Sequence, residues 1–148
     1  MTRGYKFMTV KQISVFLENK PGKLAAFTKL LSDNGIDIRA INIAEASDFG
    51  IIRMIVKDIY NATTLLKDAN YICSVTDVLA VEVKDEPGAL SSLIAVLGDK
   101  DVNVEYMYAL TNRIKGVAYM IIRPNDQAKA IAALEGSGMK IVSTDQLF

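Results

Sequence analysis

The chain has 148 residues, of which 51% are hydrophobic and 23% are charged, a composition typical of globular proteins. Its 17 basic and 17 acidic residues cancel, which argues against nonspecific binding to nucleic acid or to an anionic membrane. It has no histidine and one cysteine, Cys73, so it offers no internal disulfide, no zinc cluster and no imidazole base. We therefore expect no metal, no cofactor and no catalytic site.

No apolar run approaches the roughly 20 residues that a membrane-spanning helix needs. The first ten residues, MTRGYKFMTV, lack the long apolar segment of a secretory signal peptide. These features predict a soluble cytoplasmic protein.

The first half of the chain predicts six elements in the order strand, helix, strand, strand, helix, strand. Apolar residues alternate in the strands and recur every three or four residues in the helices. Pro21 is expected at the first position of its helix, where its missing N–H costs nothing, and Asn61 is expected to cap the second helix. The predicted strands cover residues 12–17, 36–46, 51–57 and 71–75, and the predicted helices cover 22–34 and 61–69.

The second half repeats the first at a spacing of 66 residues. Residues 15–56 align with 81–122 without a gap, and Gly50 then aligns with Gly116. Beyond this stretch the spacing becomes 68, so we expect two extra residues in the second copy near Gly136–Gly138. A repeat of this length indicates that one structural unit occurs twice.

Each copy is predicted to be a domain, residues 10–76 and residues 77–148. Two split β-α-β crossovers on one antiparallel sheet predict a ferredoxin-like α+β sandwich. No linker rich in Pro, Gly or Ser separates the copies, so we expect the two units to pack against each other.

A polar loop with Pro-Gly-x-Leu follows the first strand of each copy, ENKPGKL in 18–24 and KDEPGAL in 84–90. With the element order, and with GIDI or DVNV opening the next strand, this pattern resembles the ACT domain, twice and over nearly the whole chain. The resemblance implies a stand-alone, non-catalytic regulatory protein that binds a small ligand, usually an amino acid. It also implies two units paired side by side into an eight-stranded antiparallel sheet with helices on one face.

The resemblance places ligands between units, held by the loop of one unit and by the strand start of the other. It implies that Asn19 pairs with Asn103 and that Asp85 pairs with Asp37. The candidate ligand-binding residues are Asn19, Lys20, Pro21, Gly22, Lys23, Leu24, Asp37, Asp85, Glu86, Pro87, Gly88, Ala89, Leu90 and Asn103.

The chemistry of the loops fits such a ligand. A helix start offers unpaired N–H groups to a carboxylate, and Gly22 and Gly88 allow close approach to the backbone. The site with Asn19, Lys20 and Asn103 is the stronger of the two, because it alone combines neutral amides with a cation. The loops also suit a purely structural strand-to-helix connection, and duplication would copy structure as well as function.

Tyr106 and Tyr108 share one face of a predicted strand. Aromatic residues on such a sheet stack RNA bases in some domains. The zero net charge and the absence of an aromatic residue from IIRMIV (51–56) favour packing in a core or an interface, with ligand contact as the next alternative.

Four functions remain to be separated. The first is an amino-acid sensor, and the second is the regulatory subunit of an amino-acid biosynthetic enzyme, since the small subunit of acetolactate synthase resembles ACT proteins. The third is an interaction protein whose loops are only caps. An enzyme is the least favoured, because the sequence has no Gly-rich phosphate loop and no nucleophile elbow. As partners we expect an amino acid and either a second copy of the chain or an enzyme.

Overall fold

The computed structural model describes residues 8–110 and 114–148. Contacts divide the chain into two compact units, which we call the first unit (Lys11–Thr76) and the second unit (Asp77–Phe148, with the residues just before Lys11). Residues 10–76 and 77–148 remain our proposed domain limits.

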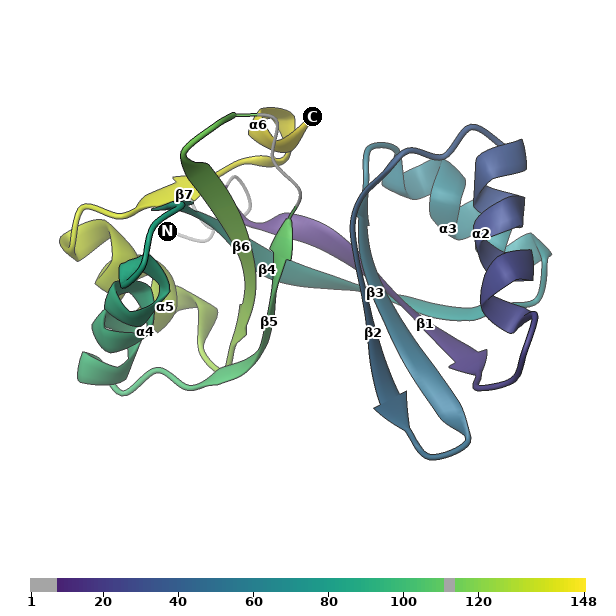
Figure 1. Ribbon diagram of the computed structural model, residues 1–148, viewed down its shortest axis with the longest axis horizontal. Coiled ribbons are helices and arrows are strands. Elements are labelled where there is room, and N and C mark those ends of the chain that lie inside the picture. The colour runs from purple at the N-terminus through teal and green to yellow at the C-terminus, as the bar shows by residue number, and fades with distance from the viewer. Residues whose placement is uncertain (1–7, 111–113) are drawn as a thin grey trace. The chain divides into compact units, whose positions relative to one another are not determined.

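The first unit is an antiparallel sheet with both of its helices on one face (Figure 1). Its elements are β1 (Val10–Glu18), α2 (Lys23–Asp33), β2 (Ile38–Ala46), β3 (Phe49–Val56), α3 (Ile59–Asp68) and the beginning of β4 (Ile72–Lys84). The strand order β2-β3-β1-β4 confirms the predicted ferredoxin-like arrangement in this unit.

The core of the first unit lies between the sheet and the helices. Every second residue of β1 and β3 faces the helices, because side chains alternate along a strand. Leu24 lies at the start of α2 and is 40% exposed, so it does not belong to this core. The buried residues of this core are Ile13, Val15, Phe27, Leu31, Ile52, Met54, Val56, Ala62 and Leu66.

The second unit repeats this arrangement, with α4 and α5 on one face of its sheet (Figure 1). Its elements are the end of β4, α4 (Ala89–Asp99), β5 (Val104–Leu110), β6 (Val117–Pro124), α5 (Gln127–Gly136), β7 (Lys140–Val142) and α6 (Thr144–Leu147). The strand order β7-β4-β6-β5 matches that of the first unit. The buried residues of its core are Leu79, Val81, Leu93, Leu97, Val102, Ile122, Ala130, Ile131 and Leu134.

A single long strand, β4, serves both units. Its beginning is the last strand of the first unit and its end is the first strand of the second. The strand expected at 71–75 is therefore only the beginning of β4, which continues through Thr76-Asp77 because this pair contains no residue that forces a turn. The described chain has seven strands instead of the expected eight, and side-by-side pairing of the units stays a prediction.

The hydrogen-bond register shows where the second copy is longer. Ile13 pairs with Met54, whereas Leu79, its counterpart 66 residues later, pairs with Ile122, which lies 68 residues after Met54. Since β2 and β5 keep the spacing of 66, the two extra residues lie between β5 and β6. The predicted position near Gly136–Gly138 is therefore wrong. A connection between two strands accommodates added residues without disturbing the strand pairs beside it.

Candidate functional site

The Pro-Gly loops form the same turn in both units. The N–H of Lys23 donates to the carbonyl of Lys20 at 3.2 Å, and Gly22 between them has φ 86° and ψ −16°. These angles define a type II β-turn with Pro21 at its second position and Gly22 at its third. Pro21 was expected at the first helical position, but α2 begins two residues later, at Lys23.

The second loop copies this geometry closely. Ala89 donates to Glu86 at 3.3 Å, and Gly88 has φ 90° and ψ −16°. The loop N–H groups also bond to equivalent hairpin carbonyls, Asn19 to Asp48 at 2.9 Å and Asp85 to Gly116 at 3.0 Å. The backbone of the loop is thus fixed from both sides.

The helices that follow the loops begin without a side-chain cap. In α2, Lys23 and Ala26 have backbone acceptors, whereas the N–H groups of Leu24 and Ala25 have no acceptor within residues 8–110 and 114–148. In α4, the N–H groups of Leu90 and Ser91 likewise have no acceptor within the described residues. Such N–H groups carry the positive end of the helix dipole and can bind an anion.

The other two long helices are capped in the ordinary way. The carboxylate of Asp58 accepts from the N–H of Asn61 at 3.1 Å, and Asp126 accepts from Lys129 at 3.0 Å. Asn61 was expected to be the cap, but it lies in the first turn of α3 and donates to the true cap, Asp58. Uncapped helix starts are therefore confined, among these four helices, to the two Pro-Gly loops.

The two loops differ in charge. Lys20 bonds to the carboxylate of Glu18 at 3.0 Å, and Lys23 lies 4.0 Å from the other oxygen of that carboxylate. The hydrogen bond from Lys20, with the charges of Lys20 and Lys23, holds the pKa of Glu18 below its ordinary value of 4.5. The second loop has Lys84, Glu86 and Ala89 at the matching positions, so an acid and an alanine stand where the first loop has its two lysines.

Within one unit, the strand-start positions do not lie near the loop. β1 and β2 both pair with β3 and run in the same direction, and the register aligns Glu18 with the end of β2 at Ala46. Asp37 precedes the other end of β2, roughly 27 Å away along nine strand residues. The same holds for Asn103 and the second loop, so one unit alone cannot unite the two halves of the expected site.

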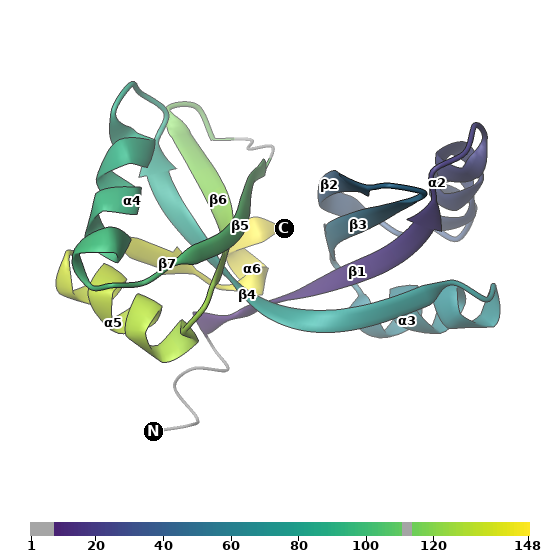
Figure 2. The ribbon, with the colours of Figure 1, turned by 90° about the horizontal axis from the view of Figure 1, so that it is seen from below.

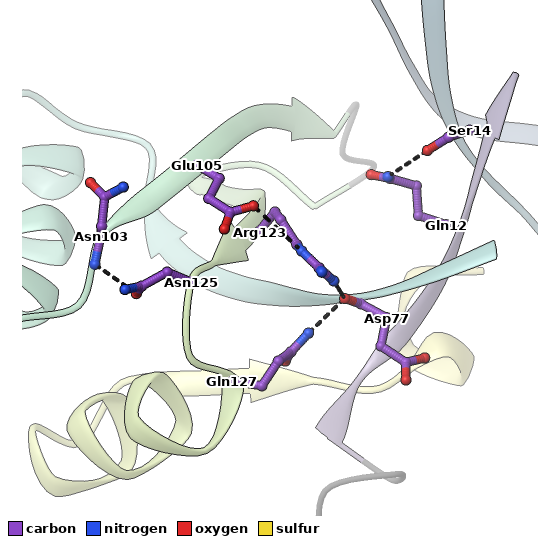
Figure 3. A network of polar contacts seen from close by, with 8 residues as sticks. All are labelled: Gln12, Ser14, Asp77, Asn103, Glu105, Arg123, Asn125 and Gln127. Carbon is purple, nitrogen blue, oxygen red and sulfur yellow. Dashed lines mark hydrogen bonds and ion pairs between the residues drawn. The ribbon is translucent and has the colours of Figure 1, made fainter. Parts of the chain in front are cut away.

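Asn103 is fixed through its backbone, and its side chain is exposed. Its N–H donates to the amide oxygen of Asn125 at 2.9 Å, and its carbonyl accepts from the N–H of Asn125 at 2.9 Å (Figure 3). Asp37 is likewise exposed. Both side chains are therefore accessible to a ligand or to another unit.

Tyr108 is only 7% exposed, which favours the packing interpretation over RNA stacking. Register pairs Tyr108 with Ile121 and Leu110 with Tyr119 on the sheet face away from the helices, and all four side chains are buried. Stacking a base needs an open ring face, which this part of the sheet does not provide.

A polar cluster that the sequence analysis missed surrounds the middle of β4. Arg123 and Gln127 both donate to the carbonyl of Asp77, at 2.9 and 2.6 Å, and Arg123 lies 3.8 Å from Glu105 (Figure 3). Nothing local in the sequence marks this cluster, because its members come from four separate elements, β4, β5, β6 and α5. In the first unit, the fully buried Gln12 donates to Ser14 at 3.2 Å.

The described residues contain no group of three or more Cys, Asp or Glu placed to hold a metal ion. None of the helices in the described ranges is long and apolar enough to cross a membrane.

Comparison with known proteins identifies the family. Residues 8–147 match the model of the ACT domain pair. The crystal structure of protein BT0572 from Bacteroides thetaiotaomicron is similar, with 38% identity, a TM-score of 0.88, and coverage of 95% of this chain and 96% of that one.

The ligand-free regulatory subunit of aspartate kinase from Thermus thermophilus shares the fold, with 16% identity, a TM-score of 0.62, and coverage of 95% and 93%. The regulatory subunit of aspartate kinase from Thermus flavus does so as well, with 16% identity, a TM-score of 0.60, and coverage of 86% and 92%. A search among curated proteins found no match. Since the family match extends over nearly the whole length, this chain belongs to the ACT domain pair family.

Proposed function

We propose that this chain is a non-catalytic regulatory protein that binds an amino acid at its Pro-Gly loops. The observation that carries the proposal is the contrast between helix starts. The carboxylates of Asp58 and Asp126 cap α3 and α5, whereas α2 and α4 follow a glycine and have no side-chain acceptor at their start. Among these four helices of the described chain, the two that lack a side-chain cap are those that follow a Pro-Gly loop, and such a start suits a carboxylate supplied by a ligand.

The shape of the turn supports this role. A Cβ placed on Gly22 or Gly88 would meet no atom within 4 Å, so the backbone is open to close approach. The type II turn holds Pro21-Gly22 in one conformation, which reduces the entropy lost when a ligand binds. The ligand carboxylate would accept from Leu24 and Ala25 in α2, or from Leu90 and Ser91 in α4.

The acceptors for the ammonium of the ligand would come from the other unit. We propose that Asn103 faces the loop of Asn19, and that Asp37 faces the loop of Asp85, in units paired side by side into an eight-stranded sheet. The separation of loop and strand start within each unit supports a site built from two units. Binding would then order the interface and change affinity for a partner.

The two sites would not bind alike. The first has amides together with Lys20 and Lys23, whereas the second has Asp85, Glu86 and Asp37. The acidic site disfavours an anionic side chain on the ligand and suits a cationic one.

For the partner we propose either a second copy of the chain or a biosynthetic enzyme. The structure of an aspartate kinase regulatory subunit shares this fold, which makes an enzyme of amino-acid biosynthesis a reasonable partner to test. Co-purification of tagged chain with a larger protein, lost on addition of ligand or dependent on it, would support the regulatory-subunit form of the proposal.

The test is thermal stability of the full chain with each of the twenty amino acids at millimolar concentration. A ligand at 100 times its dissociation constant adds about 2.7 kcal/mol to the free energy of unfolding. Asn103→Ala should remove the shift at the first site, and Asp37→Ala should remove the shift at the second. Each variant controls for the other, since both replace exposed side chains beside a strand start.

If no amino acid raises the melting temperature, or if both variants leave every shift unchanged, the loops are structural turns copied by duplication. The search should then turn to protein partners.

A further inference from the structure

A hollow among the helices of the second unit plays no part in the site proposed above. It measures about 570 Å³, and we call it the lysine hollow. Figure 2 shows α4 and α5 side by side, as Figure 1 does, and the hollow lies where the end of α4 meets α5. Its lining residues are Lys100, Lys129, Ala132, Ala133, Gly136 and Ser137.

The floor of the hollow is one face of α5. Lys129, Ala132, Ala133 and Gly136 follow one another at helical spacing, so they lie on the same side of the helix, and Ser137 caps its end. From Lys129 to Ser137 this face is about 12 Å long. Between its two ends the floor has only methyl groups and a glycine, which leaves room above it.

Both lysines stand near the end of α4. Lys100 caps that end, and the ammonium of Lys129 lies 4.0 Å from the carboxylate of the next residue, Asp101. The side chain of Asp101 is fully exposed and that of Lys129 is 47% exposed, so this pair contributes little to stability. In the part of the chain that the structure describes, the ammonium of Lys100 has no ion-pair partner. This end of the hollow therefore has an excess of positive charge.

The first unit shows that the fold does not require these charges. Asn34 caps the end of α2 as Lys100 caps the end of α4. Asn61 donates its N–H to the cap of α3 as Lys129 does to the cap of α5. The same two backbone positions thus have neutral amides in one unit and ammonium groups in the other.

The first unit also has larger side chains at the positions of the floor. Where the second unit has Ala132, Ala133 and Gly136, the first has Thr64, Leu65 and Asp68.

Room and positive charge therefore occur together in the second unit, and stability explains neither. Leu65 packs against the core of the first unit, and an alanine at this position buries less apolar surface. Two ammonium groups that approach the same hollow repel each other. Local choices that cost stability are typical of functional sites, and here both choices favour an anion.

We propose that the lysine hollow binds a small aliphatic phosphate monoester. Its phosphate lies between the ammonium groups of Lys100 and Lys129, and its carbon chain lies along Ala132, Ala133 and Gly136. A phosphate monoester carries a charge of about −1.5 to −2 at pH 7, which matches two ammonium groups.

The size and lining of the hollow exclude two other phosphate ligands. A water molecule takes up about 30 Å³ of liquid, so a hollow of about 570 Å³ has room for far more than an inorganic ion. None of the six described residues that line it is aromatic, so it offers no ring on which a nucleobase would stack. The hollow lies wholly in the second unit and shares no residue with the proposed amino-acid site, so the two proposals are independent.

The experiment is isothermal titration calorimetry of the full chain with n-butyl phosphate at low ionic strength. We expect one molecule bound per chain, with an affinity that falls as salt is added, because the charges that meet are exposed. Inorganic phosphate, which lacks the carbon chain, should bind about tenfold more weakly. n-Butanol should not bind. Succinate, a dicarboxylate, should bind more weakly, and equal affinity for succinate would overturn the assignment to phosphate.

Variants of the charged end test the two lysines. Lys100→Asn and Lys129→Asn install the residues that the first unit carries, so both are compatible with the fold. Each should weaken binding of n-butyl phosphate by about tenfold or more. Lys115→Asn removes a charge of the second unit outside the hollow, and it should leave the affinity unchanged. Asp101→Asn removes the competing carboxylate and should strengthen binding, and asparagine tolerates the φ of 58° at this position.

Two further variants test whether room matters as well as charge. Gly136→Asp adds a side chain to the floor and should weaken binding by about tenfold or more. The new Cβ would meet no atom within 4 Å, so the helix itself is not disturbed. Asn34→Lys combined with Asn61→Lys gives the first unit the charges without the room, and the chain should still bind one molecule. A second molecule bound with equal affinity would show that two lysines suffice, which would overturn the role of the hollow.

The pH dependence identifies the charge state of the ligand. The chain has no histidine, so a loss of affinity between pH 7 and about pH 5.5 reports the second ionisation of the phosphate. An affinity that stays constant over this range would contradict the match between a dianion and two ammonium groups.

The amino-acid site and the lysine hollow can be tested separately. Asn103→Ala should leave binding of n-butyl phosphate unchanged, and Lys129→Asn should leave any stabilisation by amino acids unchanged. Circular dichroism and the melting temperature check that each variant is folded. The lysine hollow is overturned if n-butyl phosphate does not bind at low ionic strength, or if its affinity survives both Lys100→Asn and Lys129→Asn in folded protein. Neither result would bear on the amino-acid site.

Discussion

The two units share their backbone and differ in their surface. The same type II turn, the same positive φ at Gly22 and Gly88, and the same Asp caps at α3 and α5 occur in both. By contrast, Asn19-Lys20 in the first loop becomes Asp85-Glu86 in the second. Backbone geometry has been retained where the fold needs it, and side chains have changed where only solvent or a ligand meets them.

The cores of the two units give the largest expected effect. Phe27→Ala should lower the free energy of unfolding by about 3–5 kcal/mol, and Leu93→Ala, at the counterpart position, by about 2–5 kcal/mol. Phe27 should lose more, because it also loses the ring contact with Tyr71, worth about 0.5–1.5 kcal/mol. Urea denaturation followed by circular dichroism measures both. An equal loss would mean that the ring contact adds nothing.

The shared turn gives the next effect. Gly22→Ala should destabilise the protein by about 1–2 kcal/mol, because φ 86° is unfavourable for a residue with a Cβ. Gly88→Ala should do the same. Gly98→Ala in α4 is the control, and it should stabilise by about 0.5 kcal/mol, since its Cβ meets nothing within 4 Å and its φ is not positive. Destabilisation by all three alike would refute the role assigned to the turn.

The smallest expected effect is a difference between the two units in how stability depends on pH. Burial, the charge of Glu82 and a hydrogen bond to Glu82 raise the pKa of Tyr119 above its ordinary value of 10.0. The folded state favours the neutral form of Tyr119. Its contribution to the free energy of unfolding is therefore fully present below pH 10 and is lost as the pH rises above that value. Ile51, the counterpart in β3, cannot ionise, so this sensitivity belongs to the second unit.

Stability of wild type and Tyr119→Phe, measured between pH 8 and about pH 11, provides the check. The variant should show a shallower decline above pH 10. Parallel curves would show that Tyr119 does not titrate differently in the folded protein.

Periodicity predicted the order of elements because it reflects packing that acts along the whole element. Phe27, Leu30 and Leu31 fall on one side of a helix wherever that helix starts, so its existence was correct while its first turn was not. The prediction for Pro21 failed because two rules competed. Proline suits the first helical position, but proline followed by glycine suits a type II turn even better.

The other differences have similar local causes. Asn61 and Asp58 are both good caps, and only the geometry of the helix start decides between them. α6 was not predicted, although Ser143 and Gln146 have the spacing of a capping box and form one. The lysine hollow could not be predicted, because it lies where α4 meets α5 and the sequence does not show how these helices pack. Comparing counterparts in the two copies would still have marked Lys100 and Lys129, which stand where the first copy has asparagine.

The longer second copy has a practical consequence for protein engineering. The connection between β5 and β6 has already accepted two residues that its counterpart between β2 and β3 lacks, while the strand pairs on either side kept their pattern. A fluorescent tag or epitope is therefore best inserted in that connection. The joint at Thr76-Asp77, inside one continuous strand, is the place where such an insertion would break hydrogen bonds of both units at once.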